Sequence, residues 1–541
     1  MPQVLPSVLF GITLLLGSPS IYQASAQAPT KQWDRSFGGS GADYLYSVQP
    51  TPDGGYILGG HSASGTSSDK SQAGKGQADY WVIKLDATGN KIWDRSFGGT
   101  GSDRLQTVRL TPDGGYLLCG YSDSGSGPDK TQAGQGDFDC WLIKIDANGN
   151  KLWDRTFGGS EADIISLLEP TNDGGFLLGG NSYSLISGDK TQTRQGGTDY
   201  WVLKVDAMGN KLWDRTFGGS GDEVLTSLLQ LPDNSYLFSG YSNSGQGGDK
   251  TQPSYGGNDF WVVKTDATGT KLWDQSYGGS GLDRPQAVRL TSDGGLLLGG
   301  SSDSPASSTK TQASHGGADY WLVKTDALGN KQWDRSYGGS ADDNLFTFQL
   351  APDGSYLLSG YSQSGSGFDK TQASQGLNDF WLIQLSASGN KLWDRSFGGS
   401  GADFSFALEA TKDGGYIVGG YSNSPLSGDK TQASQGDRDY WVVKLSGTTT
   451  ATTPAAARQV LRTYPNPAQS ELTLSLPQDF PRTGLHVSLL DATGRVVSSQ
   501  NLASAGSTEV PLSIGQHPAG LYLLRLQAPN GYLATQQIVL Q

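Results

Sequence analysis

The chain has 541 residues, of which 78 are Gly, and a formal net charge of −13 at pH 7. The length is enough for several domains, and the glycine content without a Gly-X-Y period favours a turn-rich all-β protein over a helical or collagenous one. The acidic charge, which no basic run offsets, argues against binding to nucleic acid or to an anionic membrane surface.

The N-terminal segment, residues 1–26, is predicted to be a secretory signal peptide. An apolar stretch from Val8 to Leu16 precedes Ala24-Ser25-Ala26, which has the small-x-small form of a cleavage site. The stretch is too short to cross a bilayer as a helix. No Lys or Arg comes before Lys31, which departs from the signal-peptide pattern, so an uncleaved anchor is the alternative. No other segment is apolar enough for a membrane span.

A 60-residue repeat fills residues 27–446 and uses all 14 Trp of the chain. The first Trp of each unit precedes Asp, and then Arg in every unit but one; these residues are Trp33, Trp93, Trp153, Trp213, Trp273, Trp333 and Trp393. The second Trp of each unit follows an Asp and one further residue, which is usually aromatic; these are Trp81, Trp141, Trp201, Trp261, Trp321, Trp381 and Trp441.

Each unit contains four strand-like runs joined by turns. In the first unit the runs are Tyr44 to Pro50, Gly55 to Gly60, Tyr80 to Leu85, and Lys91 to Phe97. Tight-turn sequences rich in Asp, Gly and Asn join the first run to the second and the third to the fourth. Four antiparallel strands per unit are typical of a β-propeller, although a linear solenoid of such units is the alternative.

The phase of the repeat favours a closed ring. The first complete run, Lys31 to Phe37, corresponds to a fourth strand, whereas the last unit ends after its third strand, Tyr440 to Leu445. Pairing these two ends would complete the last unit and leave no open edge. The sequence therefore predicts a seven-bladed β-propeller. The two Trp columns are expected to fill the wedges between blades rather than to serve as exposed sugar-stacking platforms.

The segment Leu85-Asp86-Ala87-Thr88-Gly89-Asn90-Lys91-Ile92-Trp93 resembles the tryptophan-docking motif of quinoprotein-type propellers. The resemblance implies that Trp packs between blades against the Gly turn, and it recurs along the chain with Ser386 and Ser446 in place of Asp in two units. The eight blades and adjacent cysteines that many of those enzymes have are absent from this sequence. The repeat as a whole resembles a 60-residue repeat of secreted Bacteroidetes proteins.

The C-terminal segment, residues 459–541, resembles the type A sorting domain of the type IX secretion system in Bacteroidetes. The resemblance rests on Tyr464-Pro465-Asn466-Pro467 and on the segments 489–495 and 520–526. It implies a small Ig-like β-sandwich that the secretion machinery recognises, and a protein that is secreted or attached to the outer-membrane surface. The chain ends without the Lys common in that family, and whether the domain is removed stays open. A Thr- and Ala-rich linker is expected at 447–458.

The two cysteines, Cys119 and Cys140, both belong to the second unit. Other units hold Gly or Ser at the first position and Tyr or Phe at the second, so both positions changed together. If the two are cross-strand neighbours in an exported protein, a disulfide bond is expected between them. Two thiols without a nearby His do not indicate a metal site.

Acidic residues recur at fixed positions in every unit, as at Asp43, Asp53 and Asp79 of the first. Paired carboxylates can hydrolyse glycosidic bonds, but a catalytic site is asymmetric and these residues repeat. Hydrogen bonds within turns are the expected role. No catalytic, cofactor or metal residue is therefore assigned. Calcium binding by some of these carboxylates stays open, but the absence of an Asp-x-Asp-x-Asp-Gly loop argues against it.

All long loops are expected on one face of the ring, since the other face receives only tight turns. Lys and Gln recur in these loops, as Lys70 and Gln72 do, and are expected to anchor them. Residues that break the repeat on this long-loop face are the candidate ligand contacts: His61, Lys75, Tyr183, Arg194, Tyr255, His315 and Phe368.

The acidic residues recur in every unit, whereas an enzyme would be expected to have catalytic residues that break the repeat. The sequence therefore favours a non-catalytic binding or scaffold protein, with a protein or glycan ligand on the long-loop face. The alternative is a secreted enzyme that acts on polysaccharides or depends on a quinone, and a purely structural envelope protein is a third possibility. The other expected partner is the type IX secretion machinery.

Overall fold

A computed structural model describes residues 28–67, 69–351, 353–447, 462–476, 483–491, 496–504, 509–515, 517–527 and 533–541. The predicted signal peptide, and the predicted linker except for Gly447, lie outside these residues. The described residues belong to two compact units, one covering 28–447 and the other covering the described part of 462–541. Within the described residues, no helix is long and apolar enough to cross a membrane.

The larger unit consists of seven four-stranded antiparallel sheets, the blades. The first strands are β2 (Asp43–Pro50), β6 (Asp103–Leu110), β10 (Asp163–Pro170), β14 (Glu223–Gln230), β18 (Asp283–Leu290), β22 (Asp343–Leu350) and β26 (Asp403–Ala410). The second strands are β3 (Tyr56–Ser62), β7 (Tyr116–Ser122), β11 (Phe176–Ser182), β15 (Tyr236–Ser242), β19 (Leu296–Ser302), β23 (Tyr356–Ser362) and β27 (Tyr416–Ser422).

The third strands are β4 (Asp79–Leu85), β8 (Asp139–Ile145), β12 (Asp199–Val205), β16 (Asp259–Thr265), β20 (Asp319–Thr325), β24 (Asp379–Leu385) and β28 (Asp439–Leu445). The fourth strands are β5 (Lys91–Phe97), β9 (Lys151–Phe157), β13 (Lys211–Phe217), β17 (Lys271–Tyr277), β21 (Lys331–Tyr337), β25 (Lys391–Phe397) and β1 (Lys31–Phe37). Blades 1 to 6 start at β2, β6, β10, β14, β18 and β22, and blade 7 combines β26, β27 and β28 with β1.

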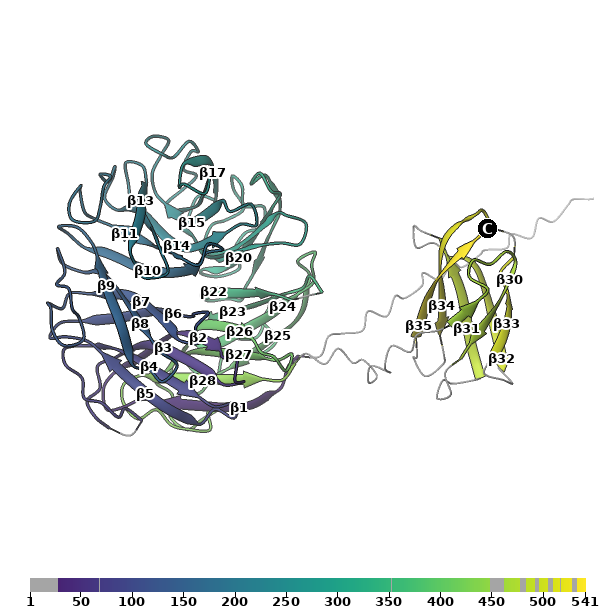
Figure 1. The fold of residues 1–541 in the computed structure, drawn as a ribbon, viewed down its shortest axis with the longest axis horizontal. Coiled ribbons are helices and arrows are strands. Elements are labelled where there is room, and N and C mark those ends of the chain that lie inside the picture. The colour runs from purple at the N-terminus through teal and green to yellow at the C-terminus, as the bar shows by residue number, and fades with distance from the viewer. Residues whose placement is uncertain are drawn as a thin grey trace, which may run out of the picture. The chain divides into compact units, whose positions relative to one another are not determined.

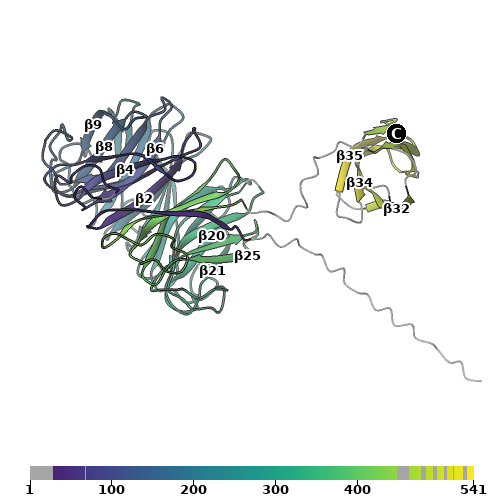
Figure 2. The ribbon, with the colours of Figure 1, turned by 90° about the horizontal axis from the view of Figure 1, so that it is seen from below.

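The first strand of each blade lies innermost, next to the first strands of the two neighbouring blades. Figure 1 shows β2, β6, β10 and β22 toward the middle of the ring, and β5, β9 and β17 at its periphery. In the second view, β6, β8 and β9 of one blade follow one another outward (Figure 2). The expected β-propeller fold is confirmed.

The ring closes through β1, as the phase of the repeat predicts. β1 pairs antiparallel with β28, with Phe37 opposite Tyr440 and Ser36 opposite Trp441. On the other side of the seam, the Tyr440 hydroxyl donates a hydrogen bond to the Trp81 carbonyl at 3.0 Å, which joins blade 7 to blade 1. The N-terminal strand thus supplies the outer strand of the last blade.

The predicted strand bounds of the first unit differ from the structure mainly in the second strand. Gly55 lies in the turn, where its amide donates to the Asp53 carboxylate at 3.1 Å, so β3 begins at Tyr56. β3 extends to Ser62 because Ser62 still pairs with Asp79 of β4. The Gly55 contact is of the kind expected for this recurring Asp, and the carboxylate also accepts a hydrogen bond from Lys84 Nζ of β4 at 3.2 Å.

The Trp column on the third strands forms the core of the blades. Trp81 and its six equivalents are fully buried. The Trp81 indole donates to the Asp94 carboxylate at 3.2 Å, which satisfies its only polar group. Tyr80 packs on Trp141 of the next blade, with ring centroids 4.9 Å apart. This column fills the space between blades, as expected.

The Trp column on the fourth strands docks on the glycine turns. Gly89 has a φ of +82°, and a Cβ atom at this position would lie 3.0 Å from the Trp33 ring of the preceding blade. The Arg35 guanidinium covers the other part of the Trp33 ring, 5.5 Å from its centroid, and donates to the Thr88 carbonyl at 3.2 Å. Gly therefore meets two requirements here: left-handed backbone and close approach of an indole.

The cysteines for which a disulfide is expected, Cys119 and Cys140, are both buried, and no S–S bond joins them in the structure. In the β7–β8 pair, Cys119 lies opposite Leu142 and Cys140 lies opposite Tyr121. The two cysteines are therefore diagonal rather than directly opposite, and their thiols are in hydrogen-bond contact. Burial raises the pKa of the Cys140 thiol well above its usual value.

The smaller unit is a two-sheet β-sandwich. One sheet has the order β29 (Arg462–Tyr464), β30 (Glu471–Ser475), β33 (Glu509–Ser513). The other has the order β32 (Val496–Ser504), β31 (Thr483–Leu490), β34 (Gly520–Gln527), β35 (Leu533–Leu540). Alternating residues such as Leu472, Leu485 and Leu524 form a buried core. The small sandwich agrees with the fold expected for the C-terminal segment.

Candidate functional site

The innermost strands enclose a cavity of about 390 Å³ along the axis of the propeller. Residues from the first strand of every blade line it. In blades 1 and 4, four consecutive residues of the first strand line the cavity, at 46–49 and 226–229. Because each first strand runs from the long-loop face to the tight-turn face, residues near its start lie toward the long loops.

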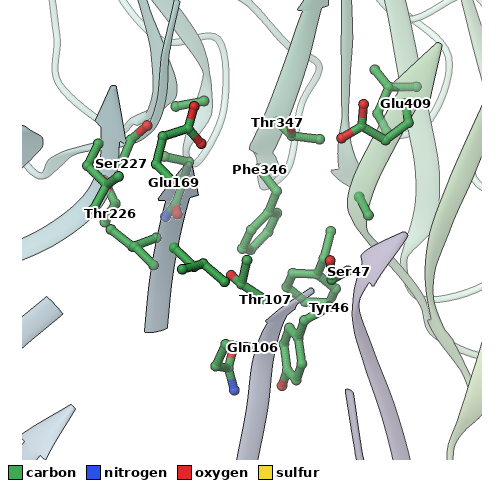
Figure 3. A pocket seen from close by; sticks show the side chains of 18 of the residues that line it. Tyr46, Ser47, Gln106, Thr107, Glu169, Thr226, Ser227, Phe346, Thr347 and Glu409 are labelled. Atoms are coloured by element: carbon green, nitrogen blue, oxygen red, sulfur yellow. The ribbon is translucent and has the colours of Figure 1, made fainter. Parts of the chain in front are cut away.

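One half of the cavity wall is aromatic. Tyr46, Phe346 and Phe406 occupy the same repeat position in blades 1, 6 and 7, which are neighbours in the ring. The ring centroids of Phe346 and Phe406 are 4.5 Å apart, and those of Tyr46 and Phe406 are 5.2 Å apart. Figure 3 shows Tyr46 and Phe346 beside the cavity.

The aromatic wall continues toward the long-loop face as a connected group that we call the aromatic arc. Tyr421 contacts Phe406 and Phe404, with centroids 5.2 Å and 5.1 Å apart, and Tyr361 contacts Phe404 at 4.8 Å. The arc consists of Tyr44, Tyr46, His61, Phe346, Tyr361, Phe404, Phe406 and Tyr421.

Arg438 covers the arc at its outer end. Its guanidinium lies 5.5 Å from the Tyr44 ring centroid and 5.8 Å from that of Tyr421, and it donates to the Tyr44 hydroxyl at 2.6 Å. These two ring faces are therefore already occupied by a cation. Tyr46, Phe346 and Phe406 line the cavity, and the rings of His61 and Tyr421 stack on those of Tyr46 and Phe406.

The other half of the same layer is polar. Blades 2 to 5 hold Gln106, Ser166, Thr226 and Gln286 at the position that is aromatic in blades 6, 7 and 1. The Thr226 hydroxyl donates to the Pro285 carbonyl at 2.7 Å. The Gln106 and Gln286 amides line the cavity, and among the described residues neither side chain has a hydrogen-bond partner.

A polar layer lies at the tight-turn end of the cavity. Glu409 accepts hydrogen bonds from Gln49 at 2.9 Å and Gln349 at 3.2 Å, and Glu169 pairs with Arg109 at 3.8 Å. Burial raises the pKa of Glu169 and Glu409, while the charges of Arg109 and Arg289 act in the opposite direction. Figure 3 shows both glutamates at one end of the cavity and Tyr46 and Gln106 at the other.

His61 is the one predicted ligand contact that belongs to the aromatic arc. Its ring lies 5.0 Å from Tyr44 and 5.6 Å from Tyr46, and the residue is only 7% exposed. Burial, together with the charge of Arg104, lowers the pKa of His61 to about 3, so the imidazole is neutral at physiological pH.

Lys75 and His315 occupy a repeat position that joins neighbouring blades. In most blades this position is Gln, as at Gln135, whose amide donates to Asp189 of the next blade at 2.7 Å. Lys75 Nζ contacts Asp129 in the same way. His315 Nδ1 lies 3.9 Å from Asp369 Oδ2. We call this recurring contact the inter-blade latch; Tyr255 occupies the equivalent position in blade 4.

The structure brings His315 and Phe368 together and separates the remaining predicted contacts. The two rings stack with centroids 4.6 Å apart, and Phe368 is 68% exposed with a φ of 50°. Arg194 folds back onto its own loop, where it donates to the Gly197 carbonyl at 2.8 Å. Tyr183 is exposed on blade 3 beside the exposed Leu185 and Ile186.

The interpretation of the sequence missed the channel residues. Their signal was nevertheless present, because the first strands vary from blade to blade and the position of Tyr46 is aromatic in three units only. Only the closed ring shows that three aromatic members of this column are neighbours. Within the described ranges, no group of three or more His, Cys, Asp or Glu side chains is arranged to hold a metal ion.

Comparison with known proteins gives a family for the C-terminal unit and distant likenesses for the rest. Residues 462–541 match the family described as the secretion system C-terminal sorting domain. The regulatory protein FlaEY of Caulobacter vibrioides is 22% identical over 352 residues, which cover 58% of this chain and 35% of that protein. The chain thus spans about a third of the curated relative it matches.

Two solved structures are among those to which the chain shows a distant similarity. PorZ, described as an essential surface component of the type IX secretion system of Porphyromonas gingivalis, is 11% identical, with a TM-score of 0.29 over 93% of this chain and 74% of PorZ. Sqt1 of Chaetomium thermophilum is 12% identical, with a TM-score of 0.38 over 78% of this chain and 100% of Sqt1.

The C-terminal match identifies the route by which the protein leaves the cell. A sorting domain of this kind directs export by the type IX secretion system to the cell surface or the extracellular space. The small β-sandwich formed by β29 to β35 is the fold of that unit. Residues 462–541 of this chain therefore belong to the secretion system C-terminal sorting domain family, and the protein is an exported β-propeller protein.

Proposed function

We propose that this exported protein is a non-catalytic binding protein that holds its ligand in the central channel and at the long-loop end of that channel. The observation that supports this is the asymmetry of one layer of the channel wall, aromatic in blades 6, 7 and 1 and polar in blades 2 to 5. A layer that only filled space would have no reason to depart from the repeat in this way.

Catalysis is the second candidate, because Glu169 and Glu409 lie in the same cavity and burial raises the pKa of both. A pair of carboxyl groups can hydrolyse a glycosidic bond. Both carboxylates are engaged, however: Glu409 by the amides of Gln49 and Gln349, and Glu169 by Arg109. These contacts favour a structural role in closing the end of the channel.

The test offers the full chain two kinds of ligand, a panel of polysaccharides and the outer-membrane proteins of the secreting cell. Retention and chemical change of the offered material are both measured. We expect retention in one arm without any new product. A Glu169→Gln, Glu409→Gln double variant then shows whether these carboxyl groups are needed for any new product.

Two results would contradict the proposed function. Release of sugar or peptide by the full chain, abolished in the double glutamine variant, would identify an enzyme. Absence of retention in both arms would favour a purely structural protein of the cell envelope.

A further inference from the structure

We infer that the central cavity binds a neutral saccharide, with the face of a sugar ring against the aromatic half of the wall and its hydroxyl groups against the polar half. This inference rests on the proposed function, because it requires the channel to be the ligand site. It adds the chemical class of the ligand and the residues that recognise it.

The aromatic half provides a surface for a flat, partly apolar ligand. Tyr46, Phe346 and Phe406 form a continuous wall, with neighbouring ring planes inclined by 60° and 65°. The faces of aromatic rings are electron-rich, so they attract the slightly positive C–H bonds that cover one face of a pyranose ring. Arg438 lies against the rings of Tyr44 and Tyr421 at the outer end of the arc. Among the described residues, no cationic side chain lies over the three rings of the wall.

The polar half provides hydrogen-bond groups that are still free. Gln106 and Gln286 flank Ser166 and Thr226 in the ring, and neither amide is bonded to another described side chain or backbone group. A carboxamide offers both a donor and an acceptor. A sugar hydroxyl also donates and accepts, so vicinal hydroxyls can satisfy these amides when the ligand displaces water.

The charges around the cavity favour a neutral ligand over a charged one. Arg109 and Arg289 are balanced by Glu169 and Glu409 at the tight-turn end. A carboxylate or ammonium group on the ligand would leave one buried charge uncompensated. A neutral ligand leaves these pairs intact.

The shape and chemistry of the wall also separate a sugar from a protein side chain. A Phe or Trp side chain from a partner would suit the aromatic half, but it would bury Gln106 and Gln286 without hydrogen bonds. The volume of about 390 Å³ is in the usual range for small-molecule sites. A sugar unit uses both halves of the wall at once.

The experiment measures binding of defined sugars to the full chain by titration calorimetry. The probes are short neutral oligosaccharides of glucose, mannose, xylose, galactose and N-acetylglucosamine, with oligogalacturonate as an anionic counterpart. We expect saturable binding of at least one neutral probe and no binding of the anionic one. Phe406→Leu removes an aromatic ring that would pack on the sugar, and Gln286→Leu removes an amide that would bond its hydroxyls. Each should weaken that binding about tenfold or more.

Matched controls use the same substitutions outside the cavity. Gln363→Leu changes an exposed residue of the long-loop face, and Phe157→Leu removes a buried ring from the outer strand β9; neither should change the affinity. Tryptophan fluorescence and the melting temperature of each variant report whether the fold is intact. Because Gln286→Leu removes no ring from the aromatic arc, it remains informative if Phe406→Leu does not fold.

Each other outcome overturns the inference in a distinguishable way. Sugar binding that neither cavity variant affects would place the ligand elsewhere on the propeller, and the proposed function would stand. Retention of protein partners with no binding of any neutral probe would likewise refute only the ligand class. Hydrolysis of a probe would refute the proposed function itself.

Discussion

The Trp441 indole donates a hydrogen bond to the Asp34 carboxylate at 3.2 Å, joining residues 407 positions apart in the sequence. In every other blade the equivalent contact is made within one continuous stretch of chain, as between Trp81 and Asp94. In blade 7 it crosses from the third strand of the last unit to the N-terminal strand. The ring is therefore held shut at this seam by non-covalent contacts alone.

Loss of Asp34 should weaken the seam. Asp34 is 1% exposed and also accepts hydrogen bonds from the amide and hydroxyl of Thr431, each at 2.9 Å. Asp34→Ala leaves the buried Trp441 indole without its partner and removes both Thr431 contacts, so we expect the free energy of unfolding to fall by about 1–3 kcal/mol. Urea denaturation measures the loss. Deletion of residues 28–37 should have a larger effect, because it exposes the edge of β28.

The matched control for this prediction is Asp214→Ala. Asp214 accepts the same kind of contacts from Trp201 and Thr191 inside blade 3. Both variants should lose a similar amount of stability, but only Asp34→Ala should become sensitive to proteolysis near β1. Equal proteolysis of the two variants would argue against the seam as the weak point.

Stability should depend on pH because carboxyl groups are buried where neighbouring blades meet. Burial raises the pKa of the third-strand aspartates to about 6; these are Asp139, Asp199, Asp319, Asp379 and Asp439. Because the pKa of these aspartates is higher in the folded protein than in the unfolded chain, the folded protein binds protons at a higher pH than the unfolded chain does. The free energy of unfolding should therefore increase from about pH 7 to about pH 5.

The turn aspartates act in the opposite direction at lower pH. At Asp53 burial favours a higher pKa, but hydrogen bonds from Thr51, Lys84 and Gly55 outweigh it and lower the pKa to about 2. The ionised turn aspartates stabilise the folded protein at pH values above their pKa in the unfolded chain. This stabilisation is lost as pH falls from about 4 to about 2. Thermal denaturation across this range should show a maximum near pH 5.

Asp139→Asn provides the control for the pH effect. Asn cannot take up the proton, so the gain in stability between about pH 7 and about pH 5 should be smaller than in the unmodified protein. A melting temperature that decreases steadily from pH 7 downward would contradict the prediction.

The inter-blade latch should tolerate exchange between Gln and Lys, because both residues occur at this repeat position. Gln375 donates to Asp429 at 2.7 Å and Gln435 donates to Asp69 at 2.6 Å, whereas Lys75 contacts Asp129 with an ammonium group. Lys75→Gln should change the free energy of unfolding by less than about 0.5 kcal/mol, because the contact is exposed and Gln can replace it. Chemical denaturation checks this.

Lys75→Ala is the informative comparison, since it removes the latch of one blade pair. We expect a loss of about 0.5–1 kcal/mol, within the range for an exposed ion pair. If Lys75→Gln abolished retention of the ligand while leaving stability unchanged, Lys75 would be a ligand contact as its departure from the repeat predicts.

The two cysteines should remain unreactive in the folded protein. Both are fully buried and free, and burial holds the pKa of Cys140 well above its usual value, so the reactive thiolate is scarce. A thiol reagent should detect no thiol in native buffer and two per chain in concentrated guanidinium chloride. Detection of none in denaturant without reductant would show that a disulfide forms after all.

The sequence by itself determined the architecture of this protein. A strict 60-residue period, two Trp columns and turn residues at fixed positions specify the same four-stranded unit each time, because each local signal agrees with the others. The offset between Lys31–Phe37 and Tyr440–Leu445 indicated closure of the ring, and the motifs from Tyr464 onward indicated the sorting domain.

Only the tertiary structure decided where the asymmetric residues meet. Tyr46 and Phe406 are 360 positions apart in the sequence, yet closure makes blades 7 and 1 neighbours and brings the two rings to 5.2 Å. Strand register likewise placed Cys119 and Cys140 diagonally, a detail that residue types do not reveal. Contacts across a ring depend on the order and register of all its strands, whereas the repeat reports only what each blade has in common.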